Sequence, residues 1–264
     1  MTIWQAAILG IIQGITEFLP ISSSGHLIFL PRFFGWPDQG LDFDAVLHLG
    51  TLLAVVIYFR SQLKKMWRAW WSNQENGHQD RKLVWGLLVA VIPAAIVGFL
   101  LGGVFERLFR SPVAIAVSLA VFGVVLGLAD WLGKKKYGVG RVGIFRALYI
   151  GLAQVLALIP GVSRSGITMT AGLTLGLKRE AAAEFSFLLS IPIIILAATD
   201  GFWHWYQSNT GLISGYNLII GLFFSFLSGI LGIGLLMKIL KKWSFWPFVL
   251  YRLLVAFLII FFFA

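Results

Sequence analysis

Two short segments of this apolar chain, residues 13–26 and 154–166, carry side chains that could hold and cleave a phosphate group. The first segment contains Glu17 and His26 around a serine-rich turn, and the second contains Arg164 inside a matching turn. An ionisable side chain inside a membrane costs several kcal/mol and persists mainly where it lines a pathway or a reaction site. The positions of these three side chains therefore need a chemical reason.

Each segment has a proline followed by serine and glycine, a pattern that ends one helix and begins another. Proline terminates a helix and serine is a favoured cap for the next one, so we expect helix breaks at Pro20 and Pro160. The start of a helix offers unpaired N–H groups and a positive dipole end to an anion, so two facing turns suit a diphosphate. The residues expected to bind it are Gln13, Ser22, Ser24, Gly25, Ser163, Ser165 and Gly166.

Four side chains are expected to supply the remaining chemistry. Glu17 and Gln13 lie four residues apart on one face of a helix, and their oxygens suit a hard divalent cation, Mg²⁺ or Ca²⁺, that bridges the diphosphate. A purely structural pairing of Glu17 with an interior arginine is the alternative. Arg164 can grip phosphate oxygens through two parallel hydrogen bonds. His26 directly follows the serine turn, which favours an acid, base or nucleophile over a core histidine.

Composition indicates an integral membrane protein. Of the 264 residues, 59% are hydrophobic and only 12% are charged, which is too apolar for an ordinary soluble domain. The continuous apolar runs indicate helices rather than barrel strands. Six runs are long enough to cross a membrane: residues 43–59, 83–105, 112–132, 185–206, 216–237 and 246–264.

The net charge of +10 reflects topology rather than binding to nucleic acid. Most lysines and arginines fall in four connections, residues 60–82, 134–146, 178–179 and 238–242. The positive-inside rule assigns these connections to the cytoplasm. The interrupted segments then become two re-entrant helical hairpins, one entering from each side, and membrane lipids are the expected surroundings.

The two halves of the chain match each other at one constant separation. The matched pairs are Gly10 with Gly151, Gln13 with Gln154, Ser22 with Ser163, Ser24 with Ser165, and Gly25 with Gly166. Inverted repeats with broken helices place a binding site where the repeats meet. We therefore expect an all-α polytopic membrane protein of one domain, with six transmembrane helices plus two re-entrant hairpins. Its repeats would span residues 3–132 and 147–264.

The motifs resemble those of one enzyme family. Residues 13–26 and 160–166, together with 43–51, 184–190 and 248–252, resemble the bacterial undecaprenyl-pyrophosphate phosphatases of the bacitracin-resistance type (UppP). The resemblance implies removal of the terminal phosphate of undecaprenyl diphosphate, which yields undecaprenyl phosphate and inorganic phosphate. It implies a polyprenyl diphosphate partner and a multi-pass protein of the bacterial inner membrane. The active site would open to the outer side and recycle the lipid that carries cell-wall precursors.

The resemblance also assigns roles within the site. The family's acidic motif reads Glu-x-x-x-Glu or Gln-x-x-x-Glu, and this chain has the second form, so proton transfer and the main metal contact fall to Glu17. Ser23 is expected to be the nucleophile with His26 beside it, while direct attack by His26 or activation of water stays open. Further ionisable candidates for contact with the site are Asp44, His48, Glu184 and Arg252.

A secondary transporter or lipid flippase is the alternative function, because broken helices in an inverted repeat suit transport equally well. The concentration of Glu, Ser, His and Arg favours phosphoryl transfer over the single ion-binding pair that a carrier needs.

Overall fold

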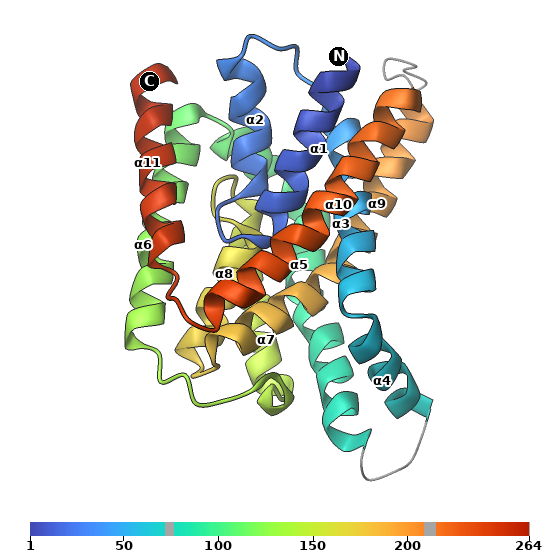
Figure 1. Ribbon diagram of the computed structural model, residues 1–264, viewed down its shortest axis with the longest axis vertical. Coiled ribbons are helices and arrows are strands. Elements are labelled where there is room, and N and C mark those ends of the chain that lie inside the picture. The colour runs from blue at the N-terminus through green and yellow to red at the C-terminus, as the bar shows by residue number, and fades with distance from the viewer. Residues whose placement is uncertain (72–76, 209–214, 264) are drawn as a thin grey trace.

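Helices make up nearly all of the computed structural model, which describes residues 1–71, 77–208 and 215–263 (Figure 1). In chain order they are α1 (Ile3–Phe18), α2 (Ser23–Phe33), α3 (Leu41–Tyr58), α4 (Arg60–Trp71), α5 (His78–Phe109), α6 (Pro112–Leu132), η2 (Val139–Arg141), α7 (Ile144–Gln154), η3 (Val155–Leu158), α8 (Arg164–Thr174), α9 (Arg179–Ser208), α10 (Gly215–Leu240) and α11 (Trp246–Phe263). The predicted all-α polytopic fold is confirmed. The sequence also predicts a connection poor in lysine and arginine at residues 207–215, and it falls mainly outside the described residues.

Five of the described helices are long and apolar enough to cross a membrane: α5, α6, α9, α10 and α11. A sixth span is obtained if α3 and α4 count as one, although they bend by 75° at their junction. The sequence interpretation placed α4 in a basic connection, whereas the structure forms a helix there. Met66 and Ala69 lie three residues apart and are buried, whereas Lys64 and Arg68 are exposed. This is the pattern of an amphipathic surface helix.

The two predicted helix breaks are present. The first lies between α1 and α2, and the second lies between η3 and α8. Figure 1 shows α1 descending from the N-terminus and α2 returning beside it, so that their turn lies in the interior of the bundle. The inverted orientation of the two whole halves stays a prediction.

Small residues hold α1 closely against α10. A Cβ atom added at Gly14 would overlap the Ser228 hydroxyl and the carbonyl oxygen of Ser225, and one added at Gly10 would overlap the carbonyl of Gly221. Small residues let membrane helices approach to backbone contact. This contact fixes the axis of α1, and with it the position of Glu17 one helix turn further along.

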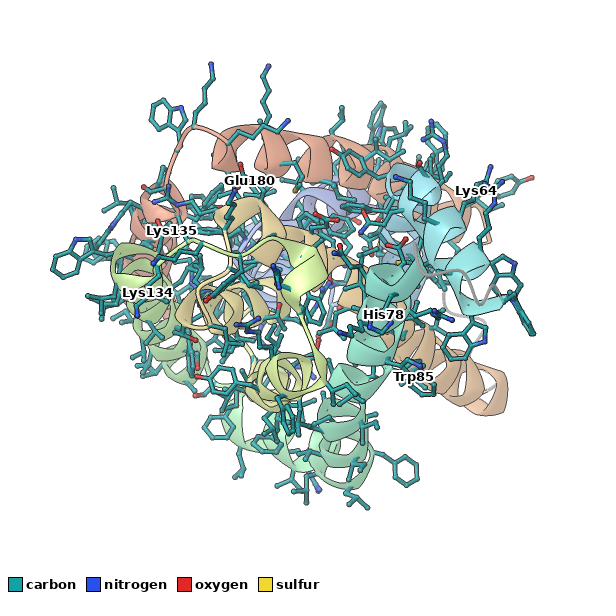
Figure 2. All side chains as sticks on the ribbon, turned by 90° about the horizontal axis from the view of Figure 1, so that it is seen from below. Lys64, His78, Trp85, Lys134, Lys135 and Glu180 are labelled. Atoms are coloured by element: carbon teal, nitrogen blue, oxygen red, sulfur yellow. The ribbon has the colours of Figure 1, made fainter. Side chains whose placement is uncertain are left out.

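The basic connections gather at one end of the molecule. Figure 2 looks at this end, where Lys64, Lys134 and Lys135 lie. Beneath them the buried carboxylate of Asp130 accepts two hydrogen bonds from Arg179, at 2.6 and 3.1 Å, and one from the backbone N–H of Phe245 at 3.1 Å. The ion pair joins α6 to α9 at the basic end, and the bond from Phe245 adds the residue that precedes α11.

Candidate active site

The first serine turn is held in an unusual backbone conformation by its own side chains. Ser22 precedes α2 with φ of 72°, a left-handed value that costs a residue with a side chain of order 1 kcal/mol or more. Its hydroxyl accepts a hydrogen bond from the N–H of Gly25 at 3.4 Å and lies 3.2 Å from the hydroxyl of Ser24. The turn is therefore locked into the cap of α2, and Ser23 becomes the first residue of that helix.

The second serine turn repeats this arrangement. Ser163 precedes α8 with φ of 73°. Its hydroxyl accepts from the N–H of Gly166 at 3.1 Å and lies 3.2 Å from the hydroxyl of Ser165. Ser165 in turn donates to the carbonyl oxygen of Leu19 at 3.1 Å, which links the second turn directly to the first.

Arg252 of α11 ties the two turns together from behind. Its side chain is fully buried. One guanidinium nitrogen donates to the carbonyl of Pro20 at 3.2 Å, and another donates to those of Gly161 and Val162, each at 3.0 Å. Arg252 was predicted as a candidate for site contact, and its partners here are backbone carbonyls that hold the turns in register.

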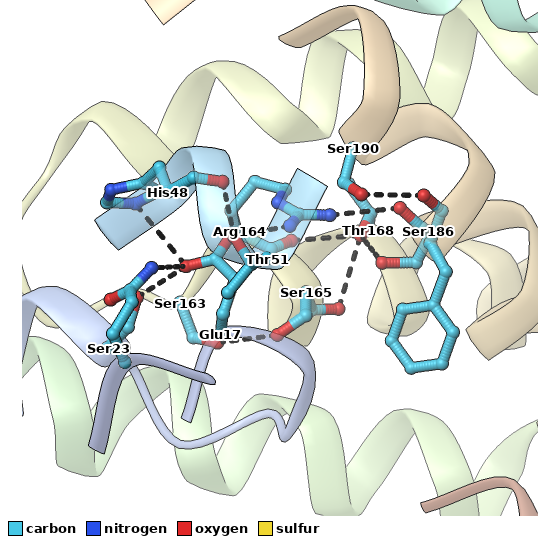
Figure 3. Close-up of polar contacts among 12 residues, drawn as sticks. Glu17, Ser23, His48, Thr51, Ser163, Arg164, Ser165, Thr168, Ser186 and Ser190 are labelled. Carbon is cyan, nitrogen blue, oxygen red and sulfur yellow. Dashed lines mark hydrogen bonds and ion pairs between the residues drawn. The ribbon is translucent and has the colours of Figure 1, made fainter. Parts of the chain in front are cut away.

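Glu17 lies at the centre of the polar cluster that forms where the turns meet (Figure 3). It is 7% exposed, and its Oε1 pairs with Nη2 of Arg164 at 2.7 Å. Its other oxygen, Oε2, accepts a hydrogen bond from the Ser23 hydroxyl at 2.7 Å. Arg164 also donates from Nη1 to the carbonyl of Ser186 on α9 at 2.9 Å. The structure thus brings the acid and hydroxyl of the first motif together with the guanidinium of the second.

Two further side chains approach the same carboxylate. Gln13 donates from Nε2 to Glu17 Oε2 at 3.1 Å. His48 of α3 places Nε2 3.5 Å from that oxygen. The remaining polar atom of Gln13, Oε1, is buried and has no hydrogen-bond partner among the described residues. His48 was a weaker sequence candidate, and its position directly against Glu17 is a finding of the structure.

His26 is oriented away from the position expected for it. Its Nδ1 lies 2.8 Å from the carbonyl of Ser22, and its Nε2 lies 2.7 Å from the hydroxyl of Tyr251. A carbonyl can only accept, so Nδ1 carries a proton and, in the neutral ring, Nε2 accepts from the tyrosine. The Ser23 hydroxyl is therefore bound by Glu17, while both nitrogens of His26 are bonded elsewhere.

Tyr251 was missed by the sequence interpretation. Its ring stacks on His26 with centroids 5.6 Å apart and planes inclined by 5°. The signal was present in the motif at residues 248–252, where the tyrosine directly precedes Arg252. The sequence also did not indicate Ser186 as a partner of Arg164, because Ser186 contributes its backbone carbonyl, which every residue type has.

Two side-chain oxygen donors at the site bear on the predicted divalent cation. Among the described residues, no group of three or more His, Cys, Asp or Glu side chains forms a metal site. The unpartnered Oε1 of buried Gln13 and the carboxylate of Glu17 nevertheless supply two oxygens. Mg²⁺ is commonly held by only one or two protein oxygens together with water and substrate phosphates, so the residues present fit such an ion.

Comparison with known proteins shows extensive similarity. The family model described as "Bacitracin resistance protein BacA" matches residues 6–258. The chain is similar to the undecaprenyl-diphosphatase of Alteromonas mediterranea, with 49% identity over 255 residues and 96% of each chain covered. It is 45% identical to undecaprenyl-diphosphatase 1 of Pseudoalteromonas translucida, over 97% of each chain. It is also 46% identical to the undecaprenyl-diphosphatase of Trichlorobacter lovleyi, covering 96% of this chain and 94% of that one.

Proposed function

The chain belongs to the bacitracin resistance protein BacA family, and we propose that it is an undecaprenyl-diphosphate phosphatase. It hydrolyses the terminal phosphate of undecaprenyl diphosphate, releasing undecaprenyl phosphate and inorganic phosphate, and so returns the lipid carrier to cell-wall synthesis. The relatives named for this activity cover nearly the whole chain. The observation that carries the chemistry is the contact of one buried carboxylate, Glu17, with the Ser23 hydroxyl and with Arg164, each at 2.7 Å.

The Ser23 hydroxyl is the proposed nucleophile. It attacks the terminal phosphorus, its proton passes to Glu17, and the bond between the terminal phosphorus and the bridging oxygen breaks to release undecaprenyl phosphate. Water then attacks the phosphorus of the phosphoserine, Glu17 passes the proton back to the serine oxygen as it leaves, and inorganic phosphate is released. The 2.7 Å hydrogen bond from Ser23 to Glu17 sets up the first proton transfer.

Arg164 is proposed to change partners when the substrate arrives. Before binding, its guanidinium neutralises Glu17 Oε1, which makes the carboxylate a weak proton acceptor. A diphosphate with more charge competes for the guanidinium, because the planar fork binds two phosphate oxygens at once. Glu17 is then released to accept the serine proton, and Arg164 stabilises the charge that develops on the transferred phosphoryl group.

The two serine turns are proposed to hold the phosphates. Each turn is the start of a helix, and the first N–H groups of a helix are a general binding site for an anion. Ser22, Ser24 and Gly25 would bind from the first turn, and Ser163, Ser165 and Gly166 would bind from the second. The hydrogen bonds among these residues fix the amide directions before substrate binds, so little reorganisation is needed during the reaction.

A divalent ion, Mg²⁺ or Ca²⁺, would be held by Glu17 and Gln13. It would neutralise part of the diphosphate charge and polarise its oxygens. The amide of Gln13 brings no charge of its own, so Glu17 supplies the only protein charge of this pair.

His26 is proposed to bind and orient rather than to attack. Direct attack would require its Nε2 to leave the Tyr251 hydroxyl, whereas the Ser23 hydroxyl already faces its proton acceptor. The hydrogen bond between Ser23 and Glu17 also argues against a transporter or flippase as the main activity, because transport does not require a hydroxyl bonded to a buried base.

The protein is a multi-pass membrane protein, and we place it in the bacterial inner membrane with its basic end in the cytoplasm. Cysteines replacing exposed residues in this naturally cysteine-free chain test the placement. Asp38→Cys should react with an impermeant maleimide outside intact cells, and Gly138→Cys should react only after permeabilisation. Both lie outside the long apolar helices, and the reverse pattern of labelling would contradict the proposed sidedness.

Phosphate release tests the activity directly. The purified chain in detergent should release inorganic phosphate from undecaprenyl diphosphate and from the shorter farnesyl diphosphate, in proportion to enzyme concentration. The matched control is Ser23→Ala, which keeps the chain's charge and removes only the hydroxyl. Binding of the lipid without release of phosphate by the unaltered chain would favour the transport alternative.

A further inference from the structure

His48 is a half-buried histidine of α3 that the mechanism above leaves without a role. Its Nδ1 lies 2.7 Å from the backbone carbonyl of Asp44. Because a carbonyl oxygen can only accept, Nδ1 must carry the proton. In the neutral ring, Nε2 then presents a lone pair, and this lone pair faces Glu17 Oε2 across 3.5 Å (Figure 3).

Two electron-rich atoms that face each other at this distance repel unless a positive partner lies between them. That partner is either a proton on His48 or a metal ion. The separation of 3.5 Å is long for an N–H···O hydrogen bond from a protonated ring, and it matches the roughly 3–3.5 Å between neighbouring ligands of one ion when each bond is about 2.1 Å. The hydrogen bond from Nδ1 to a carbonyl is the arrangement by which metal-binding histidines are usually oriented.

Gln13 supplies an independent observation at the same place. It is 0% exposed, its Nε2 contacts the oxygen of Glu17 that His48 approaches, and its Oε1 has no partner among the described residues. Rotation of the amide by half a turn exchanges the two atoms and directs the unpartnered oxygen to that position. The guanidinium of Arg164 contacts the other oxygen, Oε1, of Glu17, so among the described residues the Ser23 hydroxyl is the one further group that shares Oε2 with Gln13 and His48.

We propose that His48 Nε2 is the third protein ligand of the divalent ion that Glu17 and Gln13 hold. This deepens the proposed phosphatase function and rests on it. A neutral amide and one carboxylate give a weak site for ions that bind oxygen alone, and an imidazole nitrogen strengthens it selectively for ions that accept nitrogen. The site should therefore prefer Mn²⁺ over Mg²⁺ and Ca²⁺, even though its substrate offers only oxygen ligands.

Electron spin echo spectroscopy of the full chain in detergent, loaded with Mn²⁺ alone, tests this ligand. The echo should show modulation from one directly bound ¹⁴N nucleus, and the modulation should change to that of ¹⁵N when the chain is made with ¹⁵N-labelled histidine. His48→Gln should abolish it and weaken Mn²⁺ binding by roughly 10- to 100-fold, with a smaller change for Mg²⁺. The matched control, His78→Gln, removes an exposed histidine at the start of α5 and should keep the modulation.

Three results would overturn the proposal: bound Mn²⁺ without nitrogen modulation, modulation that survives in His48→Gln, or no saturable Mn²⁺ binding. The label exchange requires no substitution, so an absence of histidine nitrogen modulation still rejects the proposal if His48→Gln fails to fold, whereas assignment of the modulation to His48 among the four histidines rests on the folded variant. Phosphate release by the same unaltered preparation is measured alongside. Release without nitrogen modulation rejects His48 as a ligand and leaves the phosphatase intact, whereas absence of release rejects the phosphatase itself.

Discussion

The two serine turns share a backbone and differ in chemistry. Ser22 and Ser163 have φ values within a degree of each other, and each caps the glycine three residues later. The position of Glu17 before the first turn is taken by Leu158 before the second, and α7 passes into the tighter η3 helix there instead of continuing as α1 does.

This difference shows how one site is built from two unlike halves. The first half contributes the carboxylate and the hydroxyl, and the second contributes Arg164, at the position that corresponds to Ser23. Neither half holds the full set, so the reaction depends on contacts between them. Substitutions can show which half contributes what.

The largest effect is expected for Arg164→Lys. Phosphate release should fall by roughly 10³-fold or more, because a point charge cannot replace the planar guanidinium on phosphate oxygens. Lysine keeps the charge, so the chain should elute as the unaltered protein does in size-exclusion chromatography. A near-normal rate would remove Arg164 from the mechanism and leave the second turn with a binding role only.

Glu17→Gln should have the next largest effect. The rate should fall by roughly 10²- to 10³-fold, because the Ser23 hydroxyl loses its proton acceptor. The rate that remains should depend less on added divalent cation, measured by titration with Mg²⁺ and with Mn²⁺. Full activity in this variant, combined with a requirement for Gln13, would reverse the roles assigned to the two positions.

Gln13→Glu should change the rate by less than about tenfold while tightening the binding of Mg²⁺, because a second carboxylate strengthens a site for a hard ion. Isothermal titration with Mg²⁺ measures the affinity, and phosphate release under saturating metal measures the rate. Loss of activity at every metal concentration would mean that the uncharged amide is required at this position.

The smallest effect is expected at the matching position of the second half. Gln154 is 1% exposed, and neither polar atom of its side chain has a hydrogen-bond partner among the described residues. Gln154→Leu removes these two atoms at similar volume, so the free energy of unfolding should stay equal or rise by about 1–2 kcal/mol. Phosphate release should be unchanged, and a large loss would show that the second half also supplies a polar ligand.

Local features of the site followed from the sequence, and distant ones did not. Pro20, Pro160 and the capping serines act on residues a few positions away, so both breaks could be anticipated from the motifs. The join of Glu17 with Arg164 is the exception among the distant contacts, because the repeat of the two motifs predicted that their turns meet. The partner of His26 is Tyr251, 225 residues later, and no spacing rule selects it. The helix α4 was missed because its many lysines and arginines read as a connection, whereas its buried Met66 and Ala69 follow helical spacing.

Arg252 has a mechanical consequence for the molecule. Its buried guanidinium bonds the carbonyls of Pro20 on one side and of Gly161 and Val162 on the other. Alternating access in a carrier requires two halves to rock apart around a fixed site. Such rocking would separate the buried Arg252 guanidinium from its carbonyl acceptors, at a cost of several kcal/mol. The two halves are therefore expected to stay together through the reaction cycle, so that substrate and product enter and leave past a rigid centre.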